Sequence, residues 1–150
     1  VYKRQVNKDT LKDLKVGIIS SRFNTPVVSE LLNFCVKKLE SQGVSLNNIV
    51  HKEVPGALEI PLLANAFALS KQFDVLIGIG AVIRGETYHF EVVSDQSAQG
   101  VMRVQLDHNI PVINAIITTN SSEEAYARTK IKGEEAALNA IEMATLIKSL

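Results

Sequence analysis

The chain has 150 residues, 46% of them hydrophobic and 21% charged, and this composition is typical of one folded globular domain rather than a disordered chain. Sixteen basic residues balance sixteen acidic residues and no basic run stands out, so the sequence disfavours a nucleic-acid partner. No apolar run is long enough to span a bilayer and the N-terminus lacks a signal-peptide core, so we expect a cytoplasmic protein without a membrane partner.

Residues 1–14 are polar and weakly patterned, and we expect them to form a flexible tail or an arm that pairs with a neighbouring subunit. The remaining residues, 15–150, are predicted to form a single domain in which strands and helices alternate. Apolar blocks predict strands at 15–20, 46–53, 73–83 and 110–118. Helical spacing of apolar residues predicts helices at 25–42, before residue 70, from 87 to about 106, and from 122 onward.

Local signals predict where three of these helices begin. Thr25 precedes Pro26, so Thr25 is expected to be an N-cap with proline at the first helical position. Thr87 is the corresponding N-cap candidate before the third helix. Ser121 followed three residues later by Glu124 is a capping-box pattern, which predicts the start of the last helix.

The regular alternation of strands and helices predicts an α/β fold with a parallel sheet covered by helices on both faces. Because crossovers between parallel strands are right-handed, we expect a flavodoxin-like three-layer sandwich with four strands in the order 2-1-3-4. An N-terminal strand from a neighbouring subunit is one way to extend this sheet. Four strands are few for this much apolar helix surface, which favours an oligomer. The alternative is that the small residues of the helices line close contacts within one chain.

The stretch 73–90 contains the clearest candidate for a functional site. Gly78 and Gly80 lack a Cβ, so another group can approach this strand closely. The break at Gly85 and the helix start that follows bring free backbone N–H groups and the positive end of a helix dipole to one point, which favours an anion. His89 lies in the first turn of that helix, and an imidazole beside an anion site indicates acid–base chemistry on a phosphorylated substrate.

The same residue types also have simpler interpretations. The glycine spacing is not that of a dinucleotide fingerprint, and a lone histidine near a helix start is often a surface or capping residue. Phe23 could stack on a planar ligand ring or pack in the core. Arg84 could bind phosphate or pair with Glu86, and Arg128 could clamp a phosphate or be solvated. No residues have metal-ligand spacing, so no metal is expected, and the single Cys35 is expected to be a buried structural thiol.

Four blocks of the sequence resemble the signature blocks of the lumazine synthase family, which catalyses the penultimate step of riboflavin biosynthesis. They are Arg22–Asn24, Val54–Pro61, Gly80–Phe90 and Lys132–Ala137. The resemblance extends in order from about Lys15 to the C-terminus, and the central block is long and specific. It implies a transferase that condenses 5-amino-6-(ribitylamino)uracil with 3,4-dihydroxy-2-butanone 4-phosphate to 6,7-dimethyl-8-ribityllumazine, releases phosphate and water, and needs no cofactor.

The resemblance also implies roles for individual residues. Phe23 would stack on the pyrimidine ring, His89 would transfer protons, and Arg128 would clamp the phosphate, with Lys130 as the substitute for Arg128. The other implied contacts come from three segments that surround the two substrates: Ala57, Leu58 and Glu59 at the ribityl chain, Ala81, Val82 and Ile83 at the ring, and Glu86 and Thr87 at the phosphate.

This sequence departs from the family pattern at two pocket positions and in one segment. Leu58 stands where an aromatic residue is common, and Asn114 stands where phenylalanine is common, so Asn114 would make the ring pocket more polar. The segment between Arg128 and Lys132 is shorter than the corresponding stretch of many capsid-forming relatives.

The resemblance implies a homopentamer with its sites between neighbouring subunits, with a larger capsid and a riboflavin synthase partner as further options. Two other hypotheses stay open from the sequence. One is a non-catalytic module of the same fold that binds a flavin or a lumazine. The other is a purely structural shell protein, although that hypothesis leaves the grouping of Phe23, Glu59 and His89 at one sheet edge unexplained.

Overall fold

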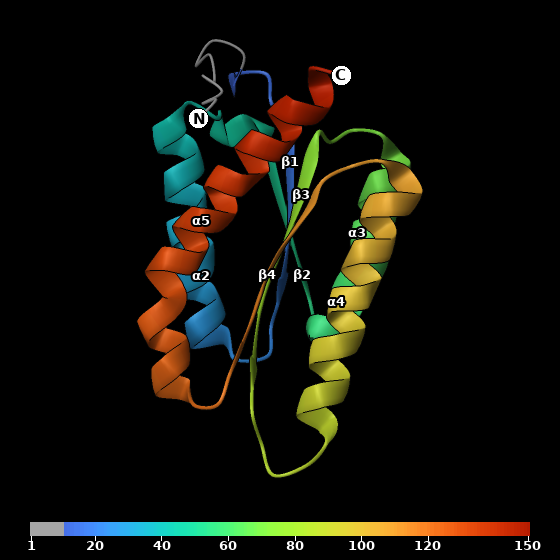
Figure 1. Ribbon diagram of the computed structural model, residues 1–150. Helices are drawn as coiled ribbons and strands as arrows, with labels where there is room; N and C mark the ends of the chain where they lie inside the picture. The colour runs from blue at the N-terminus through green and yellow to red at the C-terminus, as the bar shows by residue number, and fades with distance from the viewer. Residues whose placement is uncertain (1–10) are drawn as a thin grey trace, which may run out of the picture.

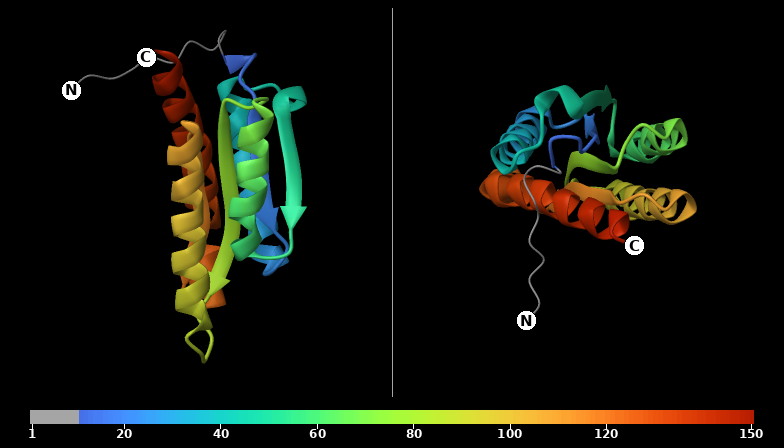
Figure 2. Two further views of the ribbon diagram at one scale, coloured as in Figure 1. Left: turned by 90° about the vertical axis from the view of Figure 1, so that its right-hand side faces the viewer. Right: turned by 90° about the horizontal axis from the view of Figure 1, so that it is seen from above.

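The computed structural model describes residues 11–150 as a three-layer α/β sandwich (Figure 1). A parallel sheet lies between two pairs of helices, with α2 and α5 on one face and α3 and α4 on the other (Figure 2). The predicted strand order 2-1-3-4 is confirmed. In chain order the elements are β1 (Val16–Ser21), α2 (Thr25–Gln42), η1 (Leu46–Asn48), β2 (Ile49–Val54), η2 (Ala57–Glu59), α3 (Ile60–Ser70), β3 (Val75–Ile83), α4 (His89–His108), β4 (Val112–Thr119) and α5 (Ser122–Lys148).

The two central strands, β1 and β3, are buried along nearly their whole length, as their continuous apolar sequences predict. The edge strand β2 is exposed at four of its six positions, which agrees with its more polar sequence. All pairings are parallel, so the carboxyl ends of the strands meet at one edge of the sheet, at the bottom of Figure 1. The loops that leave this edge lead into α2, η2, α4 and α5.

The hydrophobic core consists of two clusters, one on each face of the sheet. The larger cluster joins β1, β3 and β4 to α2 and α5, and Leu31, Cys35 and Leu39 of α2 are fully buried in it. The second cluster joins the other face of the sheet to α3 and α4 around the fully buried Ile60. Burial of apolar surface on both faces therefore fixes the position of all four helices relative to the sheet.

Cys35 is fully buried in the larger cluster, as predicted, and desolvation raises the pKa of its thiol to about 12. Because the thiolate is the reactive form, we expect the native protein to resist Ellman's reagent at pH values near 8. Denaturant should expose the thiol and allow complete labelling, with the Cys35→Ala variant as the background control. Rapid labelling without denaturant would contradict this burial.

Three helix boundaries differ from the sequence prediction. The cap of α2 is Asn24, not Thr25, because Asn24 adopts the left-handed conformation with φ of 61°. Residues 46–48 form the 3-10 helix η1 rather than the start of β2, because the side chain of Ser45 accepts a hydrogen bond from the Asn47 backbone N–H. Helix α4 begins at His89, so Tyr88 rather than Thr87 occupies the cap position. The predicted Ser121 cap is confirmed, since its hydroxyl accepts from the Glu124 N–H at 3.2 Å.

The predicted arm at 1–14 falls mostly outside the described residues, because 1–10 are not described. Leu11 and Leu14 do belong to the described part, and both are buried in the larger core cluster. The packed domain therefore includes the last residues of the segment that the sequence assigned to the arm.

Candidate active site

A cavity of about 410 Å³ opens at the carboxyl edge of the sheet, on the side of α3 and α4. We call it the first cavity. Three loops from distant parts of the sequence line it, which is the usual arrangement of a ligand site in an open parallel sheet. The lining residues are Phe23, Asn24, Pro55, Gly56, Ala57, Leu58, Glu59, Ala81, Val82, Ile83, Gly85, Thr87, His89, Phe90 and Val93.

Phe23 stands at the rim of the first cavity and is 72% exposed. Its loop is held by backbone hydrogen bonds, since the Phe23 N–H donates to the Pro55 carbonyl at 3.1 Å. The adjacent Asn24 donates from Nδ2 to the Ala81 carbonyl at 2.8 Å, which ties this loop to β3. A large aromatic ring is thus presented to solvent on a rigid turn, where a planar ligand can stack on it.

The segment after β2 lines a second side of the first cavity. The Pro55–Gly56 pair ends β2, and the Glu59 N–H donates to the Gly56 carbonyl at 3.1 Å to close η2. Leu58 and Glu59 are both exposed at the cavity wall, whereas Ala57 is buried. Within residues 11–150, no side-chain donor bonds the Glu59 carboxylate, so its oxygens can accept from ligand hydroxyls.

The carboxyl end of β3 forms the floor of the first cavity through Ala81, Val82 and Ile83. The glycines earlier in this strand do admit a close neighbour, as predicted, but the neighbour is a core side chain. A Cβ built on Gly78 would lie 3.0 Å from Cγ2 of Ile60, and one on Gly80 would lie 3.0 Å from Oγ of Ser21 in β1. Gly78 therefore serves the packing of α3 on the sheet and Gly80 the close approach of the Ser21 side chain, and the ligand-accessible part of β3 begins after them.

His89 is the first residue of α4, and its exposed side chain lines the first cavity. The Thr87 hydroxyl accepts from the His89 backbone N–H at 3.3 Å, so Thr87 supports the helix start from two residues earlier. The His89 imidazole thus borders the space that a ligand lying against Phe23 and β3 would occupy, and imidazole is a common general acid or base in enzymes.

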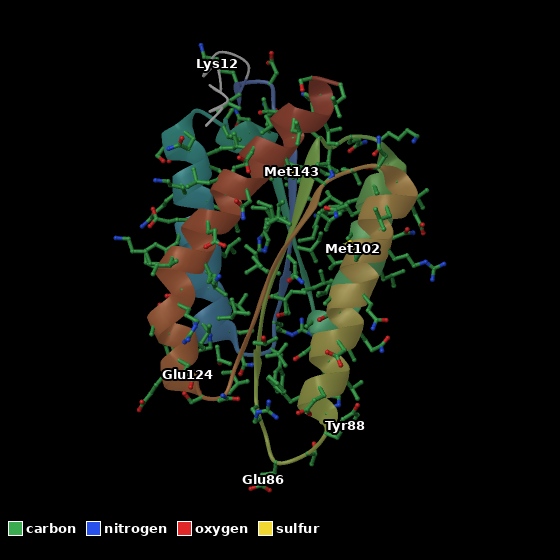
Figure 3. All side chains as sticks on the ribbon, viewed as in Figure 1. Lys12, Glu86, Tyr88, Met102, Glu124 and Met143 are labelled. Atoms are coloured by element: carbon green, nitrogen blue, oxygen red, sulfur yellow. The ribbon has the colours of Figure 1, made fainter. Side chains whose placement is uncertain are left out.

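Glu86 is the predicted site residue at the tip of the loop between β3 and α4. Its side chain is exposed and does not line the first cavity. Figure 3 shows Glu86 at the outer tip of this loop, with Tyr88 closer to the start of α4. Any contribution of Glu86 to a ligand in the cavity must therefore come from its backbone.

Arg84 does not pair with Glu86, which was one of the two interpretations from the sequence. Its guanidinium donates to Glu91 Oε1 at 2.6 Å and to Asn120 Oδ1 at 2.8 Å. It also lies 4.3 Å from the centre of the Phe90 ring, within cation–π distance. The hydrogen bond from Arg84 lowers the pKa of the Glu91 carboxyl, which keeps this pair charged.

Arg128 and Asn114 line a different cavity, of about 280 Å³, between the free edge of β4 and α5. We call it the second cavity, and no residue lines both cavities. Arg128 donates to the Glu124 carbonyl of its own helix at 2.9 Å, and no carboxylate of residues 11–150 pairs with it. Asn114 is exposed, and its Oδ1 accepts from the Ile116 N–H at 2.9 Å.

Lys132 joins Arg128 at the second cavity, whereas Lys130 does not line it. Lys132 lies one helical turn after Arg128, so both side chains project from the same face of α5. The Lys132 ammonium pairs with Glu135 at 3.6 Å, a weak surface contact that an anionic ligand can displace. The sequence analysis named Lys130 as the substitute for Arg128, although the four-residue helical spacing of Arg128 and Lys132 could have pointed to Lys132.

Six further residues line the first cavity without having been predicted as site residues: Asn24, Pro55, Gly56, Gly85, Phe90 and Val93. Val93 lies four residues after His89, so helical spacing places the two on one face of α4. Asn24 could be recognised only after the structure showed its left-handed backbone and its bond to β3. In residues 11–150 no three His, Cys, Asp or Glu side chains are close enough to hold a metal ion.

None of the helices in residues 11–150 combines the length and apolar character that a membrane span requires.

Comparison with known proteins identifies the family. The family model for 6,7-dimethyl-8-ribityllumazine synthase matches residues 13–148. The synthase of that name from Nitrosospira multiformis is 56% identical over 139 residues, which are 93% of this chain and 87% of the relative. The corresponding proteins of Cupriavidus pinatubonensis and Burkholderia vietnamiensis are 51% and 53% identical over 91% of this chain. The matched regions make up 82% and 81% of the lengths of these two relatives. The chain therefore belongs to the 6,7-dimethyl-8-ribityllumazine synthase family.

Proposed function

We propose that the chain catalyses the reaction for which its family is named, as a transferase of riboflavin biosynthesis. The reaction condenses 5-amino-6-(ribitylamino)uracil with 3,4-dihydroxy-2-butanone 4-phosphate and releases phosphate and water. Membership of the family over residues 13–148 supports this function. No observation favours the alternative of a non-catalytic module that only binds a flavin or a lumazine.

We assign the uracil substrate to the first cavity. The exposed Phe23 ring offers a stacking surface for the pyrimidine, and the Glu59 carboxylate is open to hydroxyls of the ribityl chain. Backbone groups of Ala81, Val82 and Ile83 can then hold the ring edge at the end of β3. Binding in this pose fixes the amine of the substrate beside His89, and such positioning supplies much of the rate enhancement.

His89 is proposed to move the protons of the reaction. Schiff-base formation, phosphate elimination and ring closure all require proton transfers near neutral pH, and imidazole is suited to them. Thr87 and Glu86 are proposed to offer backbone N–H groups to the phosphate at the start of α4, where the helix dipole favours an anion.

The observation that carries the proposal is the separation of the cations from the imidazole. The first cavity has no lysine or arginine among its lining residues, yet the second substrate bears a phosphate. Arg128 and Lys132 line the second cavity at the other side of the subunit. We infer that the second cavity of one subunit faces the first cavity of its neighbour, so that the Arg128 of one chain clamps the phosphate beside the His89 of another. Asn114 would reach the same composite site from β4.

A ring of five subunits is the proposed assembly. The outer faces of α3 and α4 expose large apolar residues, with Leu62 75% and Leu106 72% exposed, and such a surface favours a subunit contact. The exposed edge of β2 offers unpaired backbone groups to an additional strand, for which the N-terminal arm of a neighbour is the proposed source. A cytoplasmic location completes the proposal, while a larger capsid and a riboflavin synthase partner stay open as further options.

The direct test mixes the purified protein with the two substrates and follows the absorbance of the lumazine product. Formation of product at a rate proportional to protein concentration supports the enzyme. Retention of added lumazine without turnover would instead support the binding module. Sedimentation of the same sample gives the assembly size.

The His89→Ala variant is expected to lower kcat by about ten-fold while leaving measurable activity, because positioning of the substrates outweighs any one proton-transfer group. The KM values for both substrates should change little, since the ring contributes few binding contacts. His108→Ala is the matched control, because His108 lies at the other end of α4 and bonds Asn65 at 2.7 Å. Equal losses in the two variants would contradict a catalytic role for His89.

A further inference from the structure

Arg84 connects three elements at the carboxyl edge of the sheet. Its backbone N–H donates to the Thr119 carbonyl at 2.8 Å, and its Nε donates to Asn120 Oδ1 at 2.8 Å, so both bonds reach the end of β4. Its Nη1 donates to Glu91 Oε1 at 2.6 Å, and its guanidinium lies 4.3 Å from the centre of the Phe90 ring. The residue that follows β3 is therefore fastened both to β4 and to the first turn of α4.

The loop that Arg84 precedes has little internal support. No described group accepts a hydrogen bond from the backbone N–H of Gly85, Glu86 or Thr87. A Cβ built on Gly85 meets nothing within 4 Å, so neighbouring atoms do not confine the loop there. The shape of this loop consequently depends on how its two ends are held, and Arg84 contacts both ends.

The contacts of Arg84 argue against a direct role in binding phosphate. Its guanidinium already engages a carboxylate, an amide oxygen and an aromatic face, and Arg84 does not line the first cavity. Phe90, on which it stacks, does line that cavity, and His89 lies immediately before Phe90. A shift of the guanidinium would therefore move a wall of the cavity together with the start of α4.

We infer that Arg84 is a positioning residue, which with Glu91 holds the loop at 85–88 and the start of α4 so that free N–H groups and His89 face the phosphorylated substrate. This inference rests on the proposed function, because it assigns that loop to the phosphate. The Arg84–Glu91 pair acts on the reaction through the geometry of its neighbours, and neither side chain touches the substrate.

The experiment compares Arg84→Met, Arg84→Lys, Glu91→Gln and the double variant Arg84→Met/Glu91→Gln. We expect Arg84→Met to raise the KM for the butanone phosphate by about ten-fold, with a smaller fall in kcat, because small displacements of a binding loop weaken catalysis strongly. Glu91→Gln should raise the same KM. The double variant should resemble Arg84→Met, since both substitutions remove the same Arg84–Glu91 interaction. Arg84→Lys should rescue only partly, because lysine cannot bond Glu91 and Asn120 with one planar group.

Glu91→Gln separates this inference from a direct phosphate contact. If Arg84 bound phosphate, Glu91 would compete for it, and Glu91→Gln would lower the KM for the butanone phosphate. That result would overturn the inference. Variants that lower the melting temperature but leave the KM and kcat values unchanged would overturn it as well, because they would show a structural role only.

Arg103→Met provides the matched control, since Arg103 forms an exposed pair with Asp107 on the same helix at 3.4 Å. It should leave both KM values unchanged. A second readout is amide hydrogen exchange of the segment 85–91, which should be faster in Arg84→Met and Glu91→Gln than in the parent or in Arg103→Met. Faster exchange in these variants, together with no product from the parent protein, would contradict the proposed function and leave the positioning role of Arg84 in place. Product formation by the parent with unchanged exchange in the variants would overturn the positioning role of Arg84 alone.

Discussion

Replacing Arg128 with alanine is expected to raise the KM for the butanone phosphate by about 30-fold, which corresponds to ~2 kcal/mol for the loss of a charge-assisted contact to phosphate. The KM for the uracil substrate should change little, because Arg128 lies outside the first cavity. Steady-state kinetics with each substrate varied in turn measures both values. An unchanged KM for the butanone phosphate would contradict the proposed clamp.

Lys130→Ala is the control for this prediction. Lys130 lies two residues after Arg128 on α5, is exposed and lines neither cavity, so the variant loses the same charge at a different place. It should behave like the parent protein. If Lys130→Ala weakened the phosphate substrate as much as Arg128→Ala, the effect would be one of net charge and not of a bound phosphate.

Mixed assemblies test whether the site is composite. If His89→Ala and Arg128→Ala subunits are dissociated together and reassembled, about one site in four should combine the intact first cavity of one subunit with the intact second cavity of another. The mixture should then be more active than the mean of the two variants at low butanone phosphate. Activity equal to that mean would show that each site is built within one chain.

Gly133→Val is expected to prevent the accumulation of folded protein. Gly133 is buried where α5 crosses α2, and a Cβ there would lie 2.7 Å from the Leu31 carbonyl oxygen and 2.8 Å from the Phe34 Cβ. Neither neighbour can move without shifting the backbone of α2, so the two helices would have to separate. Overpacking in a core already costs about 1–3 kcal/mol for added methylenes. A β-branched side chain that meets the backbone of α2 costs more, and we expect this cost to exceed the free energy of unfolding of most domains of this size.

Gly133→Ala provides a graded version that folds and can be measured. Helix propensity alone predicts that alanine stabilises α5 by about 1 kcal/mol relative to glycine. The contact with α2 predicts the opposite sign, so we expect a lower melting temperature than in the parent. Glu142→Gly, at an exposed position of α5, measures the cost of glycine in this helix without the contact. A stabilised Gly133→Ala variant would contradict the close approach.

The strand order and the two helical layers could be predicted from the sequence because hydrophobic periodicity is a local property. The apolar run of β3 and the helical spacing of Leu31, Cys35 and Leu39 each require burial on a definite face. Parallel strands joined by right-handed crossovers then leave few arrangements, and the observed one is the expected order. Ser121 was predicted correctly as a cap because its partner Glu124 is only three residues away.

Where the prediction was wrong, the deciding contact came from a distant residue or from backbone conformation. Asn24 replaces Thr25 as the cap of α2 with a left-handed backbone, and its side chain donates to the Ala81 carbonyl in β3. Arg84 pairs with Glu91 instead of Glu86 because the loop turns back and brings the first turn of α4 under the guanidinium. Sequence distance does not reveal such contacts.

The sequence by itself determined the α/β class, the order of the strands and the family, since local periodicity and a long specific motif carry that information. Only the tertiary structure decided how the candidate residues divide between two cavities, with His89 and Phe23 in one and Arg128 and Asn114 in the other. The physical reason is that β4 is the edge strand of the sheet and that α5, which follows it, packs on the α2 face, whereas η2 and α4 lie on the other face. The cations of α5 and the free edge of β4 therefore lie outside the cavity that Phe23 and His89 line.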